Sequence, residues 1–370
     1  MRYIFLLLLI AVGVWVYFFL QAAGYFLTLE AKFDGTCKPV TTAGFAGPED
    51  ITIDAETSTA YLSGYDRRAA IAGHPTAGGI WAYNLADPNA QLVNLTPDAD
   101  IAFLPHGISL YRSPDGKKTL FAINHGASRQ TIEIFDVEPG KLTHRRTVTG
   151  PELISPNDVV GVGPNQFFFT NDHINREGFQ RQLEDYLRLK ISTVGYYDGT
   201  KFYPALKDLG GPNGINATPA GDTLFLSAGS EQKVHIYDRN LQTGALTQRA
   251  AVDVPGYPDN IELLPDGSFL LGIHSKILDL LQNFSNPAHP SPSRIMRLTP
   301  DGHGSYTPAD VYVNLGQEIS GASVGASLGK RLLIGDIFEP KFLDCIWPSG
   351  PDAPRSVPVP AAPAGPPPRK

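Results

Sequence analysis

One short pattern recurs six times along this 370-residue chain, and it limits the fold more than any other feature. In each copy a tight turn precedes a short apolar strand, and an alternating strand follows many of the copies, as at residues 131–135 and 233–237. The apolar strands occupy residues 60–64, 119–124, 166–171, 223–229, 268–274 and 331–337. Self-similarity at a period of roughly 40 to 60 residues is typical of propellers and repeat arrays.

A second recurrence accompanies the first, because short polar turns stand just ahead of most of these strands. They are Pro48-Glu49-Asp50, Pro105-His106-Gly107, Pro156-Asn157-Asp158, Pro212-Asn213-Gly214 and Pro258-Asp259-Asn260. A sixth place, Ser320–Ser323, keeps small polar residues without the proline. Six turns with six strands predict an all-β fold, a six-bladed β-propeller, in which the innermost strand of each blade starts near the central channel. The polar residues of the turns would therefore converge on one point.

The converging set is dominated by carboxylate and amide oxygens and contains no cysteine. It comprises Glu49, Asp50, His106, Asn157, Asp158, Asn213, Asp259 and Asn260. About six to eight hard oxygen ligands favour Ca²⁺ over Zn²⁺ or Cu²⁺, and Mg²⁺ prefers fewer protein ligands. A buried group of carboxylates without a cation would repel itself strongly. Each turn alone is a weak signal, and the recurrence in one register makes the set specific.

The N-terminal segment differs from the rest of the chain. Residues 3–29 are almost wholly apolar, with Arg2 ahead of them and Lys32 behind. The run reaches the length of about 20 apolar residues that a bilayer-spanning helix needs. It predicts a signal anchor or transmembrane helix over residues 1–30, with the propeller outside the cytoplasm. A cleaved signal peptide, which would also export the protein, and a buried soluble helix are the alternatives.

The remainder divides into a propeller domain at residues 31–347 and a Pro/Ala-rich tail at 348–370, which should be disordered. Residues 176–189 lack proline and carry apolar residues at helical spacing. They predict a small amphipathic helix inserted between blades, either over the channel mouth or on the surface without a role. The two cysteines, Cys37 and Cys345, lie near the ends of the folded region. In an exported protein they suggest one disulfide, with two free thiols as the alternative.

Charge and missing motifs exclude several classes of function. A net charge of −7 without a Lys/Arg cluster argues against nucleic-acid binding. The sequence has no G-x-S-x-G elbow, no H-E-x-x-H and no phosphate-binding loop. A serine hydrolase, a zinc protease of that type and a P-loop enzyme are therefore disfavoured.

From Cys37 to Cys345 the chain resembles the paraoxonase/arylesterase family. The matching segments, in family order, are residues 47–54, 104–111, 122–135, 155–173, 212–229, 258–267 and 330–345. The resemblance implies a six-bladed propeller with two calcium ions in its channel, and a hydrolase of lactones and aryl esters. It also agrees with a retained hydrophobic N-terminus and with one disulfide between the paired cysteines.

The resemblance also implies roles for individual residues. One catalytic calcium ion would be held by Glu49, Asn157, Asn213, Asp259 and Asn260. A deeper structural ion would be held by Asp50, Asp158 and the main-chain carbonyl of Ile108. A catalytic dyad would consist of His106 and His125, while family positions near the site or in its pocket are matched by Asp172, His173 and His274.

In the mechanism that follows, Ca²⁺ polarises the substrate carbonyl and stabilises the oxyanion, while His106 takes a proton from water. His125 would orient or relay, and an axial carboxylate such as Asp259 could act as the base or nucleophile instead. A gluconolactonase-like propeller with a single metal and a non-enzymatic propeller that binds proteins are the rival hypotheses. The paired Glu49-Asp50 and Asn157-Asp158 favour two ions, and a scaffold would need no converging acids.

Overall fold

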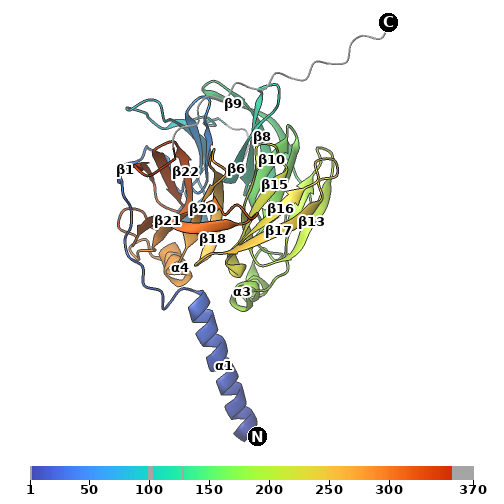
Figure 1. Ribbon diagram of the computed structural model, residues 1–370, viewed down its shortest axis with the longest axis vertical. Coiled ribbons are helices and arrows are strands. Elements are labelled where there is room, and N and C mark those ends of the chain that lie inside the picture. The colour runs from blue at the N-terminus through green and yellow to red at the C-terminus, as the bar shows by residue number, and fades with distance from the viewer. Residues whose placement is uncertain (1, 99–102, 127–128, 352–370) are drawn as a thin grey trace.

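The computed structural model describes residues 2–98, 103–126 and 129–351. This part of the chain forms six four-stranded antiparallel sheets around a central axis (Figure 1). The first strands of successive sheets contact one another round the ring. The predicted six-bladed propeller is therefore confirmed. Residues 352–370, most of the predicted Pro/Ala-rich tail, lie outside the described residues.

Each blade is a meander whose first strand lies nearest the axis. Blade 1 contains β2 (Ile51–Asp54), β3 (Thr59–Gly64), β4 (Gly79–Asn84) and β5 (Val93–Asn94). Blade 2 contains β6 (Pro105–Arg112), β7 (Lys118–Asn124), β8 (Thr131–Glu138) and β9 (Lys141–Val148). Blade 3 contains β10 (Pro156–Gly163), β11 (Gln166–Asn171), β12 (Ser192–Tyr197) and β13 (Phe202–Leu209). Blades 4 and 5 contain β14 (Pro212–Ala217), β15 (Thr223–Ala228), β16 (Lys233–Arg239) and β17 (Leu246–Asp253); and β18 (Tyr257–Leu263), β19 (Phe269–His274), β20 (Ser293–Pro300) and β21 (Tyr306–Asn314).

Blade 6 combines the two ends of the propeller. It contains β22 (Ala322–Leu328), β23 (Arg331–Asp336) and β24 (Phe342–Ile346), with β1 (Thr36–Val40) as its outermost strand. Cys37 and Cys345 face each other across β1 and β24 and form a disulfide. The predicted disulfide is thus confirmed, and it closes the ring covalently.

The recurrent apolar strands of the sequence are the second strands of the blades, and their side chains are buried almost throughout. A strand covered on both faces needs a continuous apolar run rather than an alternating one. Aromatic rings from neighbouring blades interlock there; the ring centroids of Phe225 and Phe269, for example, lie 5.0 Å apart. Packing between blades therefore holds each inner strand in a fixed position.

Helices gather at one end of the propeller (Figure 1). The described chain contains α1 (Arg2–Ala22), α2 (Arg67–Ile71), α3 (Gly178–Leu187) and α4 (Ile277–Ser285), with a short 3₁₀ turn η1 at Gly229–Glu231. Helix α3 confirms that these residues form a small helix, although it is shorter at both ends. The predicted position between blades was wrong, because α3 connects β11 to β12 within blade 3. Helices α2 and α4 were not predicted; both are short, and each lies in a connection between two strands of one blade.

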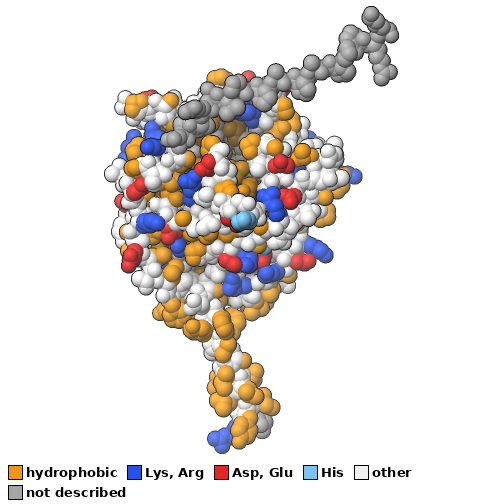
Figure 2. All heavy atoms as spheres, in the orientation of Figure 1, with side chains coloured by type: hydrophobic (Ala, Val, Ile, Leu, Met, Phe, Trp, Pro, Cys, Tyr) orange, Lys and Arg blue, Asp and Glu red, His pale blue; other side chains and the backbone are white. Residues whose placement is uncertain are grey.

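Helix α1 projects from that same end as a rod with apolar side chains along it (Figure 2). Within the described ranges it is the one helix long and apolar enough to cross a membrane, and its apolar window is not buried against the propeller. At its base the Ile277 N–H donates to Ala23 O at 3.1 Å, and Gln232 Nε2 donates to Ala22 O at 2.8 Å. The base of the helix is therefore bonded to the propeller end that carries α4.

Candidate active site at the propeller axis

In blades 2 to 5 the polar residues of the sequence repeat lie at the start of the innermost strands, not in turns before them, whereas in blade 1 Glu49 and Asp50 directly precede β2. In blades 2 to 5 the ladder to the second strand shifts register at these residues, between Pro105/Ile108, Pro156/Val159, Pro212/Ile215 and Pro258/Ile261. Such irregularities re-aim side chains and are common beside active sites. In these four blades the Pro-polar pattern therefore marks a register shift of the inner strand beside the channel.

Glycine in this repeat allows the inner strands to approach closely. A Cβ atom on Gly107 would lie 2.3 Å from Asp158 Oδ1, and one on Gly214 would lie 2.4 Å from the carbonyl oxygen of Asp259. Because only glycine lacks that atom, these positions bring the backbones of neighbouring blades together. The polar side chains of adjacent blades are consequently brought toward one another.

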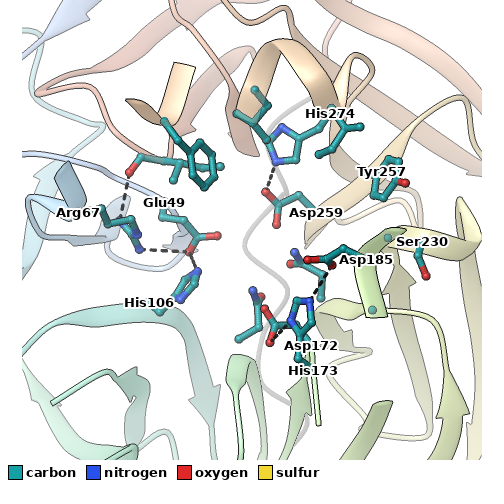
Figure 3. Close-up of a pocket in the computed structure, with 18 of the residues that line it drawn as sticks. Glu49, Arg67, His106, Asp172, His173, Asp185, Ser230, Tyr257, Asp259 and His274 are labelled. Atoms are coloured by element: carbon teal, nitrogen blue, oxygen red, sulfur yellow. Dashed lines mark hydrogen bonds and ion pairs between the residues drawn. The ribbon is translucent and has the colours of Figure 1, made fainter. Parts of the chain in front are cut away.

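A cavity of about 590 Å³ opens at the helical end of the axis. Its polar floor includes Glu49, His106, Asn157, Asn213 and Asp259. Figure 3 shows Glu49, His106 and Asp259 facing the same space. Its walls come from the helices and nearby loops and carry apolar side chains, among them those of Ile71, Leu189, Ile277, Leu280, Phe284 and Phe338. A polar floor under apolar walls is the usual arrangement of a small-molecule site.

Five buried oxygens on or beside this floor have no hydrogen-bond partner among the described residues. They are Glu49 Oε2, Asn157 Oδ1, Asn213 Oδ1, Asp259 Oδ1 and Asn260 Oδ1. Buried polar atoms in proteins are rarely left unpaired, so a cluster of five demands an explanation. They belong to the same five residues that the family resemblance assigns to one calcium ion.

The cluster depends on amide oxygens as well as carboxylates. Across residues 2–98, 103–126 and 129–351, no three His, Cys, Asp or Glu side chains are grouped so that they could hold a metal ion alone. Asn260 Nδ2 donates to Glu49 Oε1 at 2.8 Å and to Glu49 O at 3.0 Å, which fixes both side chains. The other side-chain oxygens of the pair, Glu49 Oε2 and Asn260 Oδ1, accept no hydrogen bond from the described part of the chain.

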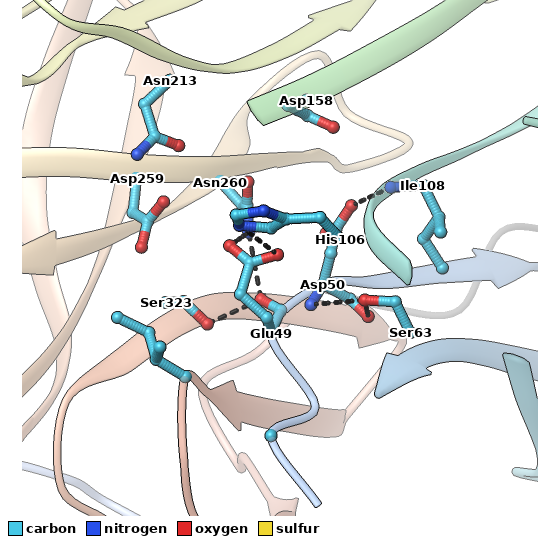
Figure 4. Close-up of polar contacts among 12 residues, drawn as sticks. Glu49, Asp50, Ser63, His106, Ile108, Asp158, Asn213, Asp259, Asn260 and Ser323 are labelled. Atoms are coloured by element: carbon cyan, nitrogen blue, oxygen red, sulfur yellow. Dashed lines mark hydrogen bonds and ion pairs between the residues drawn. The ribbon is translucent and has the colours of Figure 1, made fainter. Parts of the chain in front are cut away.

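Asp50 and Asp158 form a second acidic layer beside the first (Figure 4). Each is only 3% exposed. Each accepts one N–H bond from the next residue and one from the next blade. For Asp50 the latter donor is Ile108 N at 2.7 Å, and for Asp158 it is Ile215 N at 2.7 Å. Ile108, whose carbonyl is a predicted ligand, therefore lies against Asp50.

Burial and mutual repulsion oppose ionisation of all the carboxylates in the two layers when no cation is bound. Burial and the charge of Glu49 raise the pKa of Asp50 well above its usual range, and burial with the charge of Asp50 does the same for Asp158. Burial also raises the pKa of Asp259. Glu49 behaves differently: burial opposes its charge, but His106 and Arg67 lower its pKa to about 2. A divalent ion would relieve this repulsion.

The two histidines of the predicted dyad are in contact. His106 Nδ1 lies 2.6 Å from His125 Nε2, and His106 Nε2 lies 3.4 Å from Glu49 Oε2. Burial, followed by the neighbouring His106, lowers the pKa of His125 to about 3. His125 is therefore neutral at pH 7, and His106 connects it to the acidic floor.

The remaining predicted residues line the same cavity. His274 Nε2 lies 2.7 Å from Asp259 Oδ2. His173 bridges Asp172 and Asp185 of α3, with Nδ1 at 3.0 Å and Nε2 at 2.8 Å from their Oδ1 atoms. Burial opposes the charge of His173, but these bonds raise its pKa to about 9. The inserted helix is thus tied to the cavity wall by a charged histidine.

One cationic residue at the floor was missed by sequence analysis. Arg67 of α2 is buried, and its Nη2 lies 4.0 Å from Glu49 Oε2. Its Nη1 donates to Gly47 O at 2.8 Å. The sequence offers no signal for this contact, because Arg67 lies outside the repeat and is brought in by a short unpredicted helix.

The fold and the cavity define a class of enzyme-like propeller with an acid- and amide-lined pocket at its axis. The model of the arylesterase family matches residues 70–345. Serum paraoxonase/arylesterase 2 of Bos taurus is 30% identical over 267 residues, covering 70% of this chain and 75% of the relative. Serum paraoxonase/arylesterase 1 of Homo sapiens is 29% identical over 267 residues, covering 71% and 74%. This chain belongs to the arylesterase family, and it is a hydrolase of the esterase or lactonase type.

Solved structures with low sequence identity share the fold. The luciferin-regenerating enzyme superposes with a TM-score of 0.51 at 11% identity, covering 86% of this chain and 97% of that one. A regucalcin from Agrobacterium tumefaciens superposes with a TM-score of 0.50 at 15% identity, covering 88% and 100%. These likenesses support the propeller architecture.

Proposed function

We propose that this protein is a calcium-dependent hydrolase of lactones and aryl esters. The observation that carries the proposal is the cluster of five unpartnered oxygens on Glu49, Asn157, Asn213, Asp259 and Asn260. All five are hard donors, and the number suits the six to eight oxygen ligands typical of Ca²⁺ once water or substrate completes the set. Their residues would hold the catalytic ion.

Asp50 and Asp158 support a second, structural ion beside the first. Two more buried carboxylates with raised pKa values stand next to the catalytic layer. A single cation would leave part of their repulsion with Glu49 in place. This favours two ions, with the Ile108 carbonyl as a further ligand, over a gluconolactonase-like centre with one metal. The same concentration of buried acid argues against a scaffold without catalytic function.

The residues around the floor suit the hydrolysis of an ester bond. The chemistry supplied there by bound Ca²⁺ is polarisation of the substrate carbonyl and stabilisation of negative charge on its oxygen. His106 Nε2, beside Glu49, is placed to accept a proton from attacking water. His125 holds the His106 ring, and Asp259, oriented by His274, is the other candidate base.

The N-terminal helix supports a membrane-attached enzyme. Its 21 residues, Arg2–Ala22, match the length of a bilayer span and remain unburied. The disulfide fits an oxidising compartment. The arrangement we propose is an anchor over residues 1–30, a catalytic propeller over 31–347 outside the cytoplasm and a Pro/Ala-rich tail over 348–370. Removal of the anchor as a signal peptide would give a secreted form.

A lactonase assay with metal depletion tests the proposal. Hydrolysis of γ- and δ-lactones and of phenyl acetate should stop after dialysis against EDTA and return when Ca²⁺ is added. Asn213→Ala and Asp259→Ala should each lower kcat/KM by at least about a thousandfold, because each removes an oxygen from the ion that stabilises the transition state. Calcium affinity, measured by equilibrium dialysis, should fall in both variants.

The control is Asn89→Ala, which removes the amide of an exposed residue in the loop after β4. It should keep wild-type activity and calcium binding. Hydrolysis that survives EDTA, or near-normal rates in both site variants, would contradict the proposed metal centre. Calcium binding without hydrolysis of any ester in the panel would favour a non-enzymatic propeller.

A further inference from the structure

His125 has a second polar side-chain partner, which the family resemblance did not assign. Strand β7 ends at Asn124 and β8 begins at Thr131, and these two residues pair across the hairpin. The next residues outward, His125 and Gln130, therefore face each other. Gln130 Oε1 lies 2.5 Å from His125 Nδ1. The backbone register brings this glutamine to the dyad.

The contacts form a chain of acceptors and donors that leads to the floor of the cavity. Gln130 bonds Nδ1 of His125, whose Nε2 lies 2.6 Å from Nδ1 of His106. The far nitrogen of His106, Nε2, lies 3.4 Å from Glu49 Oε2. Since His125 is neutral at pH 7, it carries a single ring N–H. Only one of its two nitrogens can donate.

The carbonyl oxygen of a glutamine can only accept a hydrogen bond. His125 must then be protonated at Nδ1, which leaves a lone pair on its Nε2. That lone pair accepts from Nδ1–H of His106, so the lone pair of a neutral His106 is on Nε2. Once Nε2 takes up a proton, the charged ring pairs with Glu49 Oε2 at 3.4 Å. If the Gln130 amide were turned so that its NH₂ faced His125, both tautomers would reverse and Nε2 of His106 would carry the proton.

We infer that Gln130 is a positioning residue that sets the tautomers of His125 and His106, so that Nε2 of His106 faces the cavity as a proton acceptor. The catalytic consequence rests on the proposed hydrolase function, but the tautomers themselves can be measured without turnover. The hydrogen bond made by one ring nitrogen of a histidine decides which nitrogen carries the proton, and therefore which nitrogen can accept one in a reaction. Gln130 thereby acts on the reaction through two other side chains.

The test is long-range ¹H–¹⁵N NMR of the full chain labelled with ¹⁵N-histidine, at pH 8 with Ca²⁺. In the wild type, His106 and His125 should both appear as Nδ1–H tautomers. Gln130→Leu should shift both toward Nε2–H and lower kcat by about fivefold to tenfold with little change in KM, as expected for loss of one hydrogen bond. Gln130→Glu keeps an acceptor oxygen and should retain the wild-type tautomers and most of kcat.

The matched control is Gln248→Leu, since Gln248 Nε2 lies 3.1 Å from His235 Nδ1 in blade 4, where neither residue lines the cavity. It should leave kcat and the two dyad tautomers unchanged. An Nε2–H tautomer at His125 in the wild type, or unaltered tautomers in Gln130→Leu, would overturn the inference. The predicted tautomers in a protein that hydrolyses no ester would instead count against the proposed function alone.

Discussion

Asp50→Asn is the substitution that best separates the metal hypothesis from a purely structural role of the acidic layer. Asp50 is 3% exposed and accepts hydrogen bonds from Ile51 N at 2.8 Å and Ile108 N at 2.7 Å. Asparagine keeps the shape but offers one oxygen instead of two and carries no charge. The effect on stability should therefore depend on whether calcium is present.

Without calcium the substitution has two opposed effects. Loss of one acceptor for a buried N–H costs about 1–3 kcal/mol, while removal of a carboxyl beside Glu49 relieves repulsion. With calcium the variant also loses an ion. At 1 mM Ca²⁺, a site with a Kd on the order of 1 µM contributes about 4 kcal/mol of unfolding free energy. At about 2 °C per kcal/mol for a domain of this size, that contribution corresponds to about 8 °C in Tm.

Differential scanning calorimetry in 1 mM Ca²⁺ and in 1 mM EGTA measures both terms. The calcium-induced rise in Tm should be smaller by about 8 °C in Asp50→Asn than in the wild type, while the two proteins should unfold within a few degrees of each other in EGTA. Asp253→Asn, at an 83% exposed side chain of β17, should behave as the wild type in both buffers. An equal calcium-induced rise in Asp50→Asn and wild type would refute the deeper ion site.

Three further predictions address the surroundings of the site. Because the folded pKa of His173 is raised to about 9, its contacts should stabilise α3 fully below about pH 6.5 and be lost as pH rises through 9. The protection factors of the α3 amides, corrected for the intrinsic pH dependence of exchange, should fall over that range, and Asp185→Asn should remove the fall. Replacing Cys37 and Cys345 with serine should lower the unfolding free energy by up to about 5 kcal/mol in denaturant titrations, because the bond spans 308 residues. Deleting residues 2–20 should release the enzyme from membranes with kcat/KM unchanged; continued sedimentation with membranes would count against the anchor.

The sixfold architecture could be predicted from the sequence because every blade requires the same types of residue at its first and second strands. A second strand buried on both faces needs an apolar run, as at Phe167–Phe169. An inner strand with a shifted register at the axis needs a Pro-polar start, as at Asn157 and Asp158. Those requirements are local, so they appear as motifs. The disulfide was similarly accessible, because only Cys37 and Cys345 were available to form it.

Contacts made by a segment that connects two strands in only one blade leave no repeated pattern in the sequence. Arg67 reaches Glu49 through α2, and Arg68 ties that helix to α4 by donating to the carbonyl oxygens of Asn283 and Phe284. The two Arg68 bonds join residues more than 200 positions apart. No periodic signal marks them or the contact of Arg67 with Glu49. Gln130 was inside a matching segment, yet its bond to a histidine depends on the register of one hairpin.

The most direct test of the metal centre is a crystal structure of protein transferred from EGTA into Ca²⁺, with anomalous difference density. The account predicts a peak at 2.3–2.6 Å from the free oxygens of Glu49, Asn157, Asn213, Asp259 and Asn260. A second peak should lie beside Asp50 and Asp158. Density for water alone at those oxygens, with calcium found only on the surface, would contradict it.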